Sequence, residues 1–281
     1  MYPFLRSLLF QLNAETAHHL SLQAMRLAEQ LGVLALVYPE VECVSPIEVM
    51  GLRFPNRIGL AAGLDKEGNT IDALGRLGFG FIEIGTITPR PQAGNDKPRL
   101  FRLIDEKSII NRMGFNNVGI HAAVKRLEKR RCKAVVGVNI GKNFDTPNEA
   151  AVNDYLYCLK VAYPVADYIA VNISSPNTKG LRDLQAEESI RQLLGALKKE
   201  QASLQKDTGK KVPMLVKIAP DLEAVPDLYQ LHRDTHAIAT LAHAALQHRG
   251  HVQLLAHFAE DVVLVLALED RKSTRLNSSH T

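Results

Sequence analysis

Short apolar runs alternate with amphipathic segments over most of the chain. The runs have the length and the β-branched residues of buried strands, whereas the segments between them repeat apolar residues at helical spacing. Because this alternation is typical of strand–helix units around a parallel sheet, we predict an α/β fold. The strands are predicted to be apolar on both faces, as is typical where helices cover a parallel sheet or barrel. The expected strands are 58–62, 81–86, 134–140, 168–173 and 212–218, and the expected helices between them are 68–77, 117–130, 149–162 and 184–205.

The first 37 residues or so carry a different pattern. Apolar positions recur at helical spacing from Phe4 to Leu31 with no strand between them, which predicts a hairpin of one or two helices. Such helices can pack on their own domain or lie in a membrane interface, and the pattern leaves both possibilities open. Residues 41–60 are interrupted by Pro and Gly, which predicts a β-hairpin leading into the main domain.

Small, polar and cationic residues follow the predicted strands at the same point of each unit. In a (β/α)₈ barrel the carboxyl ends of the strands form a single mouth, so these residues would meet around one ligand. Each has a structural explanation of its own, such as a tight turn at Gly63 or a surface pair of Asp65 and Lys66, and only their joint occurrence favours a site. They are Ala62 to Lys66, Gly85 and Thr86, Asn139, Asn172 to Asn177, and Lys217.

Two lysines at strand ends, Lys66 and Lys217, indicate a particular chemistry. A fixed ammonium beside a conjugated ring stabilises the anion that forms when the ring accepts a hydride, as a flavin does. No Gly-x-Gly-x-x-Gly follows the first strand, so a Rossmann dinucleotide site is not indicated. The long loop 88–117 is typical of a lid or binding loop, and its Asn111 and Asn116 suit a substrate with amide or carboxylate groups.

Composition narrows the choice of partners. The chain has 281 residues, 46% hydrophobic and 23% charged, with a net charge of only +4. Since no stripe of basic and aromatic residues accompanies this charge, nucleic acid is not expected as a partner. The three cysteines are far apart and form no Cys-x-x-Cys, so we expect neither a disulfide framework nor a zinc site. No signal peptide is indicated, and no apolar run is long enough to span a bilayer.

The strand-end motifs together resemble the dihydroorotate dehydrogenase family. The similarity is to its quinone-dependent, membrane-associated class, because Ser175 stands where the soluble class is expected to have cysteine and because the soluble class lacks the N-terminal helices. It extends over about residues 1–222. The motifs are Ala61–Lys66, Glu83–Thr86, Thr88–Pro91, Asn111–Asn117, Asn139–Lys142, Asn172–Asn177 and Lys217–Asp221.

The resemblance implies a (β/α)₈ TIM barrel of the FMN-dependent type that oxidises dihydroorotate to orotate in pyrimidine biosynthesis. FMN would be the first electron acceptor and a quinone the second, and no metal is expected. Ser175 would be the catalytic base. The matching substrate positions are Lys66, Asn111, Arg112, Met113, Gly114, Phe115, Asn172 and Asn177, and the matching FMN positions are Ala62, Gly63, Leu64, Asp65, Lys66, Thr86, Asn139, Asn172 and Lys217.

The same resemblance gives residues 1–40 a role at the membrane. These helices would meet the cytoplasmic side of the inner membrane and admit the quinone, with His18, His19 and Arg102 near its path. The protein would then be peripheral, and a monomer is expected.

The C-terminal part departs from the family pattern. The glycine-rich turns that would bind the flavin phosphate are missing, since only Gly250 follows Gly209, and seven of the ten histidines lie beyond residue 231. Of these, His232 and His236 form no convincing metal site. Residues 270–280 look like a translated sequencing adapter. We therefore predict a partial barrel over 41–221, truncated after about five strands, and a non-family, artefactual tail over 222–281. The alternative is a catalytically dead fragment that cannot bind FMN.

Overall fold

A parallel six-stranded sheet forms the centre of the computed structural model, which describes residues 2–38, 45–176, 178, 180–217 and 238–240. All five predicted strands are present, and a sixth, β10, was not predicted. The tail boundary predicted after residue 221 lies outside the described residues. The strand order is β10-β9-β8-β7-β4-β3, and the strands are β3 (Gly59–Leu60), β4 (Phe81–Ile87), β7 (Val135–Ile140), β8 (Tyr168–Asn172), β9 (Met214–Lys217) and β10 (Ile238–Thr240).

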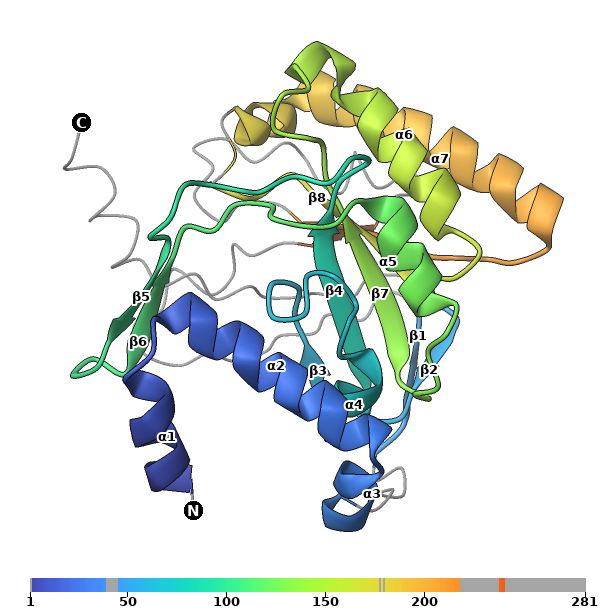
Figure 1. Cartoon of the computed structure of the whole chain (residues 1–281). Helices are drawn as coiled ribbons and strands as arrows, with labels where there is room; N and C mark the ends of the chain where they lie inside the picture. The colour runs from blue at the N-terminus through green and yellow to red at the C-terminus, as the bar shows by residue number, and fades with distance from the viewer. Residues whose placement is uncertain (1, 39–44, 177, 179, 218–237, 241–281) are drawn as a thin grey trace, which may run out of the picture.

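Three helices cover the outer face of this sheet (Figure 1). Outward residues such as Val138 and Val171 are fully buried in one cluster with apolar residues of these helices. The last helix begins later than predicted because Leu181–Gln185 forms a short 3₁₀ helix before it. The helices are α5 (Ile120–Leu127), α6 (Ala151–Ala162) and α7 (Glu187–Thr208), while α4 (Ile71–Arg76) follows β3 and the 3₁₀ turn η1 (Asn148–Ala150) precedes α6.

The inner face of the sheet is apolar only at the amino ends of its strands. There Tyr168 and Leu215 pack against Met50 and Phe54 from the predicted β-hairpin, which is present as β1 (Ile47–Val49) and β2 (Leu52–Phe54). The same face also carries Glu83 within β4, and Asn139 and Asn172 towards the carboxyl ends of β7 and β8, all three buried. The prediction that both faces are apolar is therefore wrong at these three positions of the inner face.

The N-terminal residues are helical as predicted, but they form three helices instead of one or two, and these dock on the long loop after β4. They are α1 (Tyr2–Phe10), α2 (Ala14–Gln30) and α3 (Val33–Val37), and the loop contains the antiparallel strands β5 (Leu100–Leu103) and β6 (Ser108–Asn111). Arg102 Nη1 donates to the carbonyl of Leu12 at 2.8 Å, and its guanidinium lies 4.6 Å from the centre of the Phe10 ring. These contacts attach α1 and the start of α2 to β5.

A buried ion pair makes the second attachment of the hairpin. Arg99 donates to both carboxylate oxygens of Glu15, at 2.7 and 3.2 Å, and both side chains are only 6% exposed. Arg99 also donates to the carbonyls of Ala93 and Asn95, so α2 and the loop share one guanidinium. Its hydrogen bond lowers the pKa of Glu15 to about 2.

Replacing Glu15 by alanine leaves Arg99 buried without its carboxylate and is expected to lower the free energy of unfolding by about 3 kcal/mol. In the unsubstituted chain, the stability contributed by the ionised Glu15 is fully present above pH 4.5, the ordinary pKa of a glutamate. It is lost as the pH falls towards about 2, the pKa of Glu15 in the folded protein. Urea unfolding followed by circular dichroism between about pH 3 and pH 7 measures both effects.

Lys160→Ala is the matched control, because its ammonium lies 3.4 Å from Glu200 in a more exposed ion pair between α6 and α7. Such a pair contributes less than about 1 kcal/mol. Equal losses of stability in the two variants would contradict a special role for the Glu15–Arg99 pair.

Candidate active site

Three predicted site residues form one buried chain of hydrogen bonds at neighbouring strand ends. Asn172 Nδ2 donates to Thr86 Oγ1 at 2.8 Å, and Thr86 Oγ1 donates to Asn139 Oδ1 at 2.6 Å. All three side chains are buried, and β8, β4 and β7 each supply one. The structure thus brings these strand ends together, as the sequence predicts.

Glu83 anchors this chain from within the sheet. Its carboxylate accepts from Asn139 Nδ2 at 2.8 Å and from the Tyr168 hydroxyl at 3.2 Å, and Lys217 Nζ lies 3.5 Å away. Burial, and then the neighbouring Glu83, raise the pKa of Tyr168 well above its usual range. Sequence reasoning quoted Glu83 only as part of a motif and missed this role, although a lone carboxylate in an apolar strand is a usable signal.

Gly85 allows β4 to approach β7 closely at this point. It has a φ of +109°, and a Cβ built on it would lie 2.4 Å from the carbonyl oxygen of Asn139. A side chain would therefore be strained and would separate the two strands. The contact between Thr86 and Asn139 depends on this glycine.

Lys66 ties the loop after β3 to the end of the long loop. Its ammonium donates to the carbonyl of Gly114 at 2.8 Å and to Asn116 Oδ1 at 2.6 Å. Burial, and then the Arg99 guanidinium, lower the pKa of Lys66 to about 8. Since an ammonium has three hydrogens, this one can still donate to a ligand.

Asp65 shapes the same loop from inside. Its two oxygens accept from the backbone of Asn69 at 2.9 Å and of Thr70 at 2.6 Å, and its side chain is buried. Burial raises its pKa. A surface pair of Asp65 with Lys66 is therefore wrong. Of the other predicted FMN positions in this loop, Ala62 and Gly63 are half-buried and Leu64 is exposed.

The predicted substrate residues of the long loop divide into two groups. Met113, Gly114 and Phe115 are buried, and a Cβ on Gly141 would touch both Thr86 and the Phe115 ring, at 2.8 and 2.9 Å. Phe115 thus lies beside the network. By contrast, Asn111 and Arg112 are exposed. The side-chain oxygen of Asn111 accepts a hydrogen bond from Met113 N, and the Arg112 guanidinium donates one to the carbonyl of Pro98.

Ser175 lies three residues beyond the end of β8 and is half-buried. Its neighbour Ser174 donates twice to Asn172 Oδ1, from the backbone and from the hydroxyl, both at 3.0 Å. The turn that carries Ser175 is therefore fixed to the network by Asn172. The predicted substrate residue Asn177 lies outside the described residues.

A cavity of about 160 Å³ lies between α2 and the loop after β3. His18, His19, Lys66 and Asn116 are among the residues that line it. Burial is the main cause of a lowered pKa at His18. Arg102 does not line this cavity and instead docks α1 and α2 on β5.

Together, the described groups suit a conjugated or anionic ligand. Lys66 and Lys217 supply two cations, and Thr86, Asn139 and Asn172 supply hydroxyl and amide groups at one edge of the sheet. Because hydrogen bonds hold Thr86, Asn139 and Asn172 to one another and Lys66 to the long loop, these groups need little reordering when a ligand binds.

Known proteins are similar to this chain both in sequence and in fold. The family model for dihydroorotate dehydrogenase matches residues 45–247, and the match therefore continues past residue 221. A dihydroorotate dehydrogenase (quinone) from Akkermansia muciniphila is 56% identical over 237 residues, which are 83% of this chain and 68% of that protein. One from Cellvibrio japonicus is 59% identical over 223 residues, which are 79% and 65% of the two chains. One from Azotobacter vinelandii is 49% identical over 276 residues, which are 98% and 79%.

Solved structures of dihydroorotate dehydrogenase (DHODH) are also similar to this chain in fold. The crystal structure of DHODH from Eimeria tenella in complex with ferulenol matches with a TM-score of 0.68 and 35% identity, over 81% of this chain and 66% of that chain. This chain spans about two thirds of the length of such relatives. The predicted barrel fold is thereby confirmed, with six of its strands among the described residues. The chain belongs to the dihydroorotate dehydrogenase family.

Proposed function

We propose that this chain oxidises (S)-dihydroorotate to orotate in pyrimidine biosynthesis, with FMN as the first electron acceptor and a quinone as the second. The observation that carries the proposal is the buried chain of hydrogen bonds from Glu83 through Thr86 to Asn172, at the strand ends where a barrel binds its ligand. The relatives named as quinone-type dihydroorotate dehydrogenases support the same activity.

The residues present fit FMN. Lys217 brings an ammonium to the carboxyl end of β9, where Glu83 holds it at 3.5 Å. Gly63 has a φ of +118°, and a Cβ there would meet nothing within 4 Å, so a flat ring can approach this backbone. Ala62, Thr86, Asn139 and Lys217 would hold the flavin. When bound, FMN supplies the acceptor for the hydride that leaves C6 of the substrate.

Ser175 and the residues around it would carry the proton chemistry. In our proposal the Ser175 hydroxyl takes the C5 proton, so that loss of this proton and of the C6 hydride leaves the C5=C6 double bond of orotate. A serine hydroxyl is a weak base, so its position must compensate, and Asn172 fixes the turn that carries it. Lys66 and the second amide hydrogen of Asn172 would bind the substrate.

Residues 1–40 would meet the membrane and receive the quinone. Large apolar side chains are exposed along α1–α3, with Phe4 74%, Leu31 69% and Leu36 85% exposed. The cavity lined by His18 and His19 is also lined by Lys66. It therefore lies between α2 and the candidate site. None of the described helices is both long and apolar enough to cross a bilayer. We propose that the protein is a peripheral monomer on the cytoplasmic side of the inner membrane, with the exposed apolar side chains of α1–α3 as its contact with the lipid.

A second candidate is a fragment that binds no FMN. Within the described residues the sheet has two edges, β3 and β10, which do not pair with each other. Such edges favour association with other strands over a stable flavin site. A chain that takes up no FMN would support this second candidate, whereas a chain that takes up FMN can be tested as follows.

Addition of dihydroorotate to the flavin-loaded chain is expected to bleach the visible flavin absorption. Ser175→Ala should keep the flavin and bleach at least about 100-fold more slowly, because it loses the proposed base. Stopped-flow absorption measures both rates.

Ser203→Ala, at an exposed position on α7, is the matched control and should bleach like the unsubstituted chain. A flavin-loaded chain that does not bleach would refute the proposed reaction. Equal rates for Ser175→Ala and the control would refute the role of Ser175.

Leu36→Glu on α3 is expected to weaken binding to anionic phospholipid vesicles about tenfold or more, because it replaces an exposed apolar side chain by a charge. Co-sedimentation with vesicles measures the bound fraction. Tyr157→Glu is the control, since Tyr157 is 45% exposed on α6, which lies away from α3 (Figure 1). Equal effects of the two substitutions would count against a membrane-facing hairpin.

A further inference from the structure

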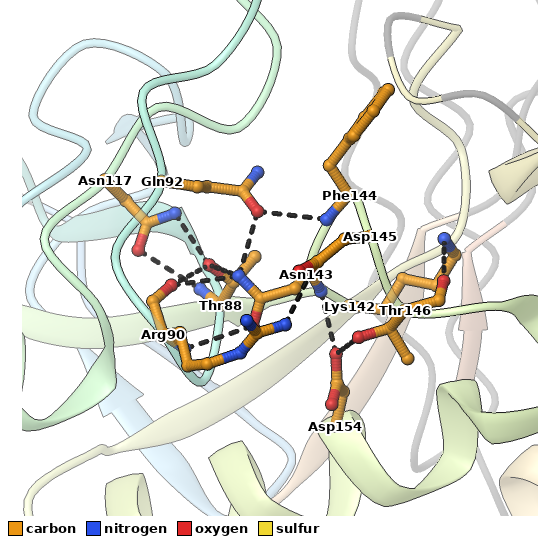
Figure 2. A network of polar contacts seen from close by, with 10 residues as sticks. All are labelled: Thr88, Arg90, Gln92, Asn117, Lys142, Asn143, Phe144, Asp145, Thr146 and Asp154. Atoms are coloured by element: carbon orange, nitrogen blue, oxygen red, sulfur yellow. Dashed lines mark hydrogen bonds and ion pairs between the residues drawn. The ribbon is translucent and has the colours of Figure 1, made fainter.

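The loop after β7 is joined to the loop after β4 by a polar network around Asn143 (Figure 2). The Asn143 side chain is buried. Its Oδ1 accepts from Arg90 N at 3.1 Å, while its Nδ2 lies within 2.9–3.1 Å of three acceptors: Thr88 Oγ1, the Arg90 carbonyl and Gln92 Oε1. The Asn143 side chain thus holds residues 88–92 through its oxygen and through the two hydrogens of its nitrogen, which the three acceptors share.

The same network reaches the start of α5 and the buried part of the long loop. Thr88 Oγ1 also accepts a hydrogen bond from Asn117 Nδ2 at 2.9 Å. The same Asn117 nitrogen donates a second hydrogen bond to the Phe115 carbonyl at 2.8 Å. The backbones of Gln92 and Asn117 exchange two further hydrogen bonds. Asn143 is therefore linked to Phe115 through Thr88 and Asn117, by hydrogen bonds at every step.

On its other side Asn143 is fixed to the sheet and to α6. Its backbone N–H donates to Asp154 Oδ2 at 2.8 Å, and the same oxygen accepts from Thr146 Oγ1 at 2.7 Å. Two residues earlier, Gly141 lies in the close contact with Thr86 and the Phe115 ring. The loop after β7 is thus a rigid support against which the long loop is held.

We propose that Asn143 is a positioning residue that holds Phe115 against the substrate side of the candidate site. This inference rests on the proposed function. An amide fits this position because its oxygen accepts from Arg90 N while its nitrogen donates towards Thr88 Oγ1, the Arg90 carbonyl and Gln92 Oε1. A carboxylate of the same size supplies only acceptors.

Asn143→Asp in the full chain tests the inference without any ligand. Hydrogen exchange followed by mass spectrometry should be about tenfold faster or more in residues 88–92 and 115–119, because the donated bonds are lost and like lone pairs face each other. Exchange in β7 and β8 should not change. Gln92→Leu removes one acceptor at similar volume. It should also speed exchange of the Phe144 amide hydrogen, because Phe144 N donates to Gln92 Oε1 at 3.0 Å in the unsubstituted chain.

A second readout concerns the site itself. In the flavin-loaded chain, Asn143→Asp should weaken orotate binding about tenfold, seen as a shift of the flavin spectrum, and should leave flavin affinity unchanged. Asn56→Asp is the matched control, because Asn56 also clamps loops, accepting from Ile58 N and donating to the Gly78 carbonyl, at the opposite ends of the strands.

Unchanged exchange in 88–92 and 115–119, or equal loss of orotate affinity in the Asn56 control, would overturn the inference. An unsubstituted chain that binds neither flavin nor orotate would instead contradict the proposed function. The exchange comparison would then still decide whether Asn143 holds the segment around Phe115.

Discussion

The candidate site depends on one buried carboxylate, that of Glu83, inside the sheet. Removing a carboxylate from water costs several kcal/mol unless charges and hydrogen bonds replace the water. Here Lys217, the Tyr168 hydroxyl and the Asn139 amide replace it. Since Glu83 only accepts, it draws the Nδ2 of Asn139 and leaves that residue's Oδ1 facing Thr86.

The hydrogen bond from Asn139 to Glu83 fixes the donor and the acceptor of each following hydrogen bond in the series. Thr86 gives its only hydroxyl hydrogen to Asn139, so it can only accept from Asn172. Asn172 uses its Nδ2 for Thr86, so its Oδ1 accepts from Ser174. A single carboxylate thus orients a series of side chains that ends beside Ser175, the proposed base.

Sequence reasoning succeeded where a pattern is local. The parallel strands follow from runs of apolar residues, and the residues at their ends follow from the rule that parallel strands share one edge. It failed where a role depends on contacts between distant segments. The role of Asn143 cannot be predicted from the residues near it in the sequence, because the hydrogen-bond partners of its side chain lie 51 to 55 residues away. The short strand β10 was missed because its surroundings no longer follow the alternation of the earlier units.

The N-terminal helices and the site are connected by charged and backbone contacts. Arg99 donates both to Glu15 on α2 and to the carbonyl of Asn95. The backbone N–H of Asn95 in turn donates to the Met113 carbonyl. The next residue, Gly114, accepts from Lys66. Hydrogen bonds therefore connect α2 to the segment that carries Phe115.

Titration of FMN with the purified chain, followed by flavin fluorescence, tests most directly whether Glu83 organises a flavin site. The unsubstituted chain is expected to bind FMN with saturation, and Glu83→Leu to bind at least about tenfold more weakly, since Lys217 and Asn139 then lose the group that orients them. Equal affinities in the two chains, or no binding by the unsubstituted chain, would contradict the account.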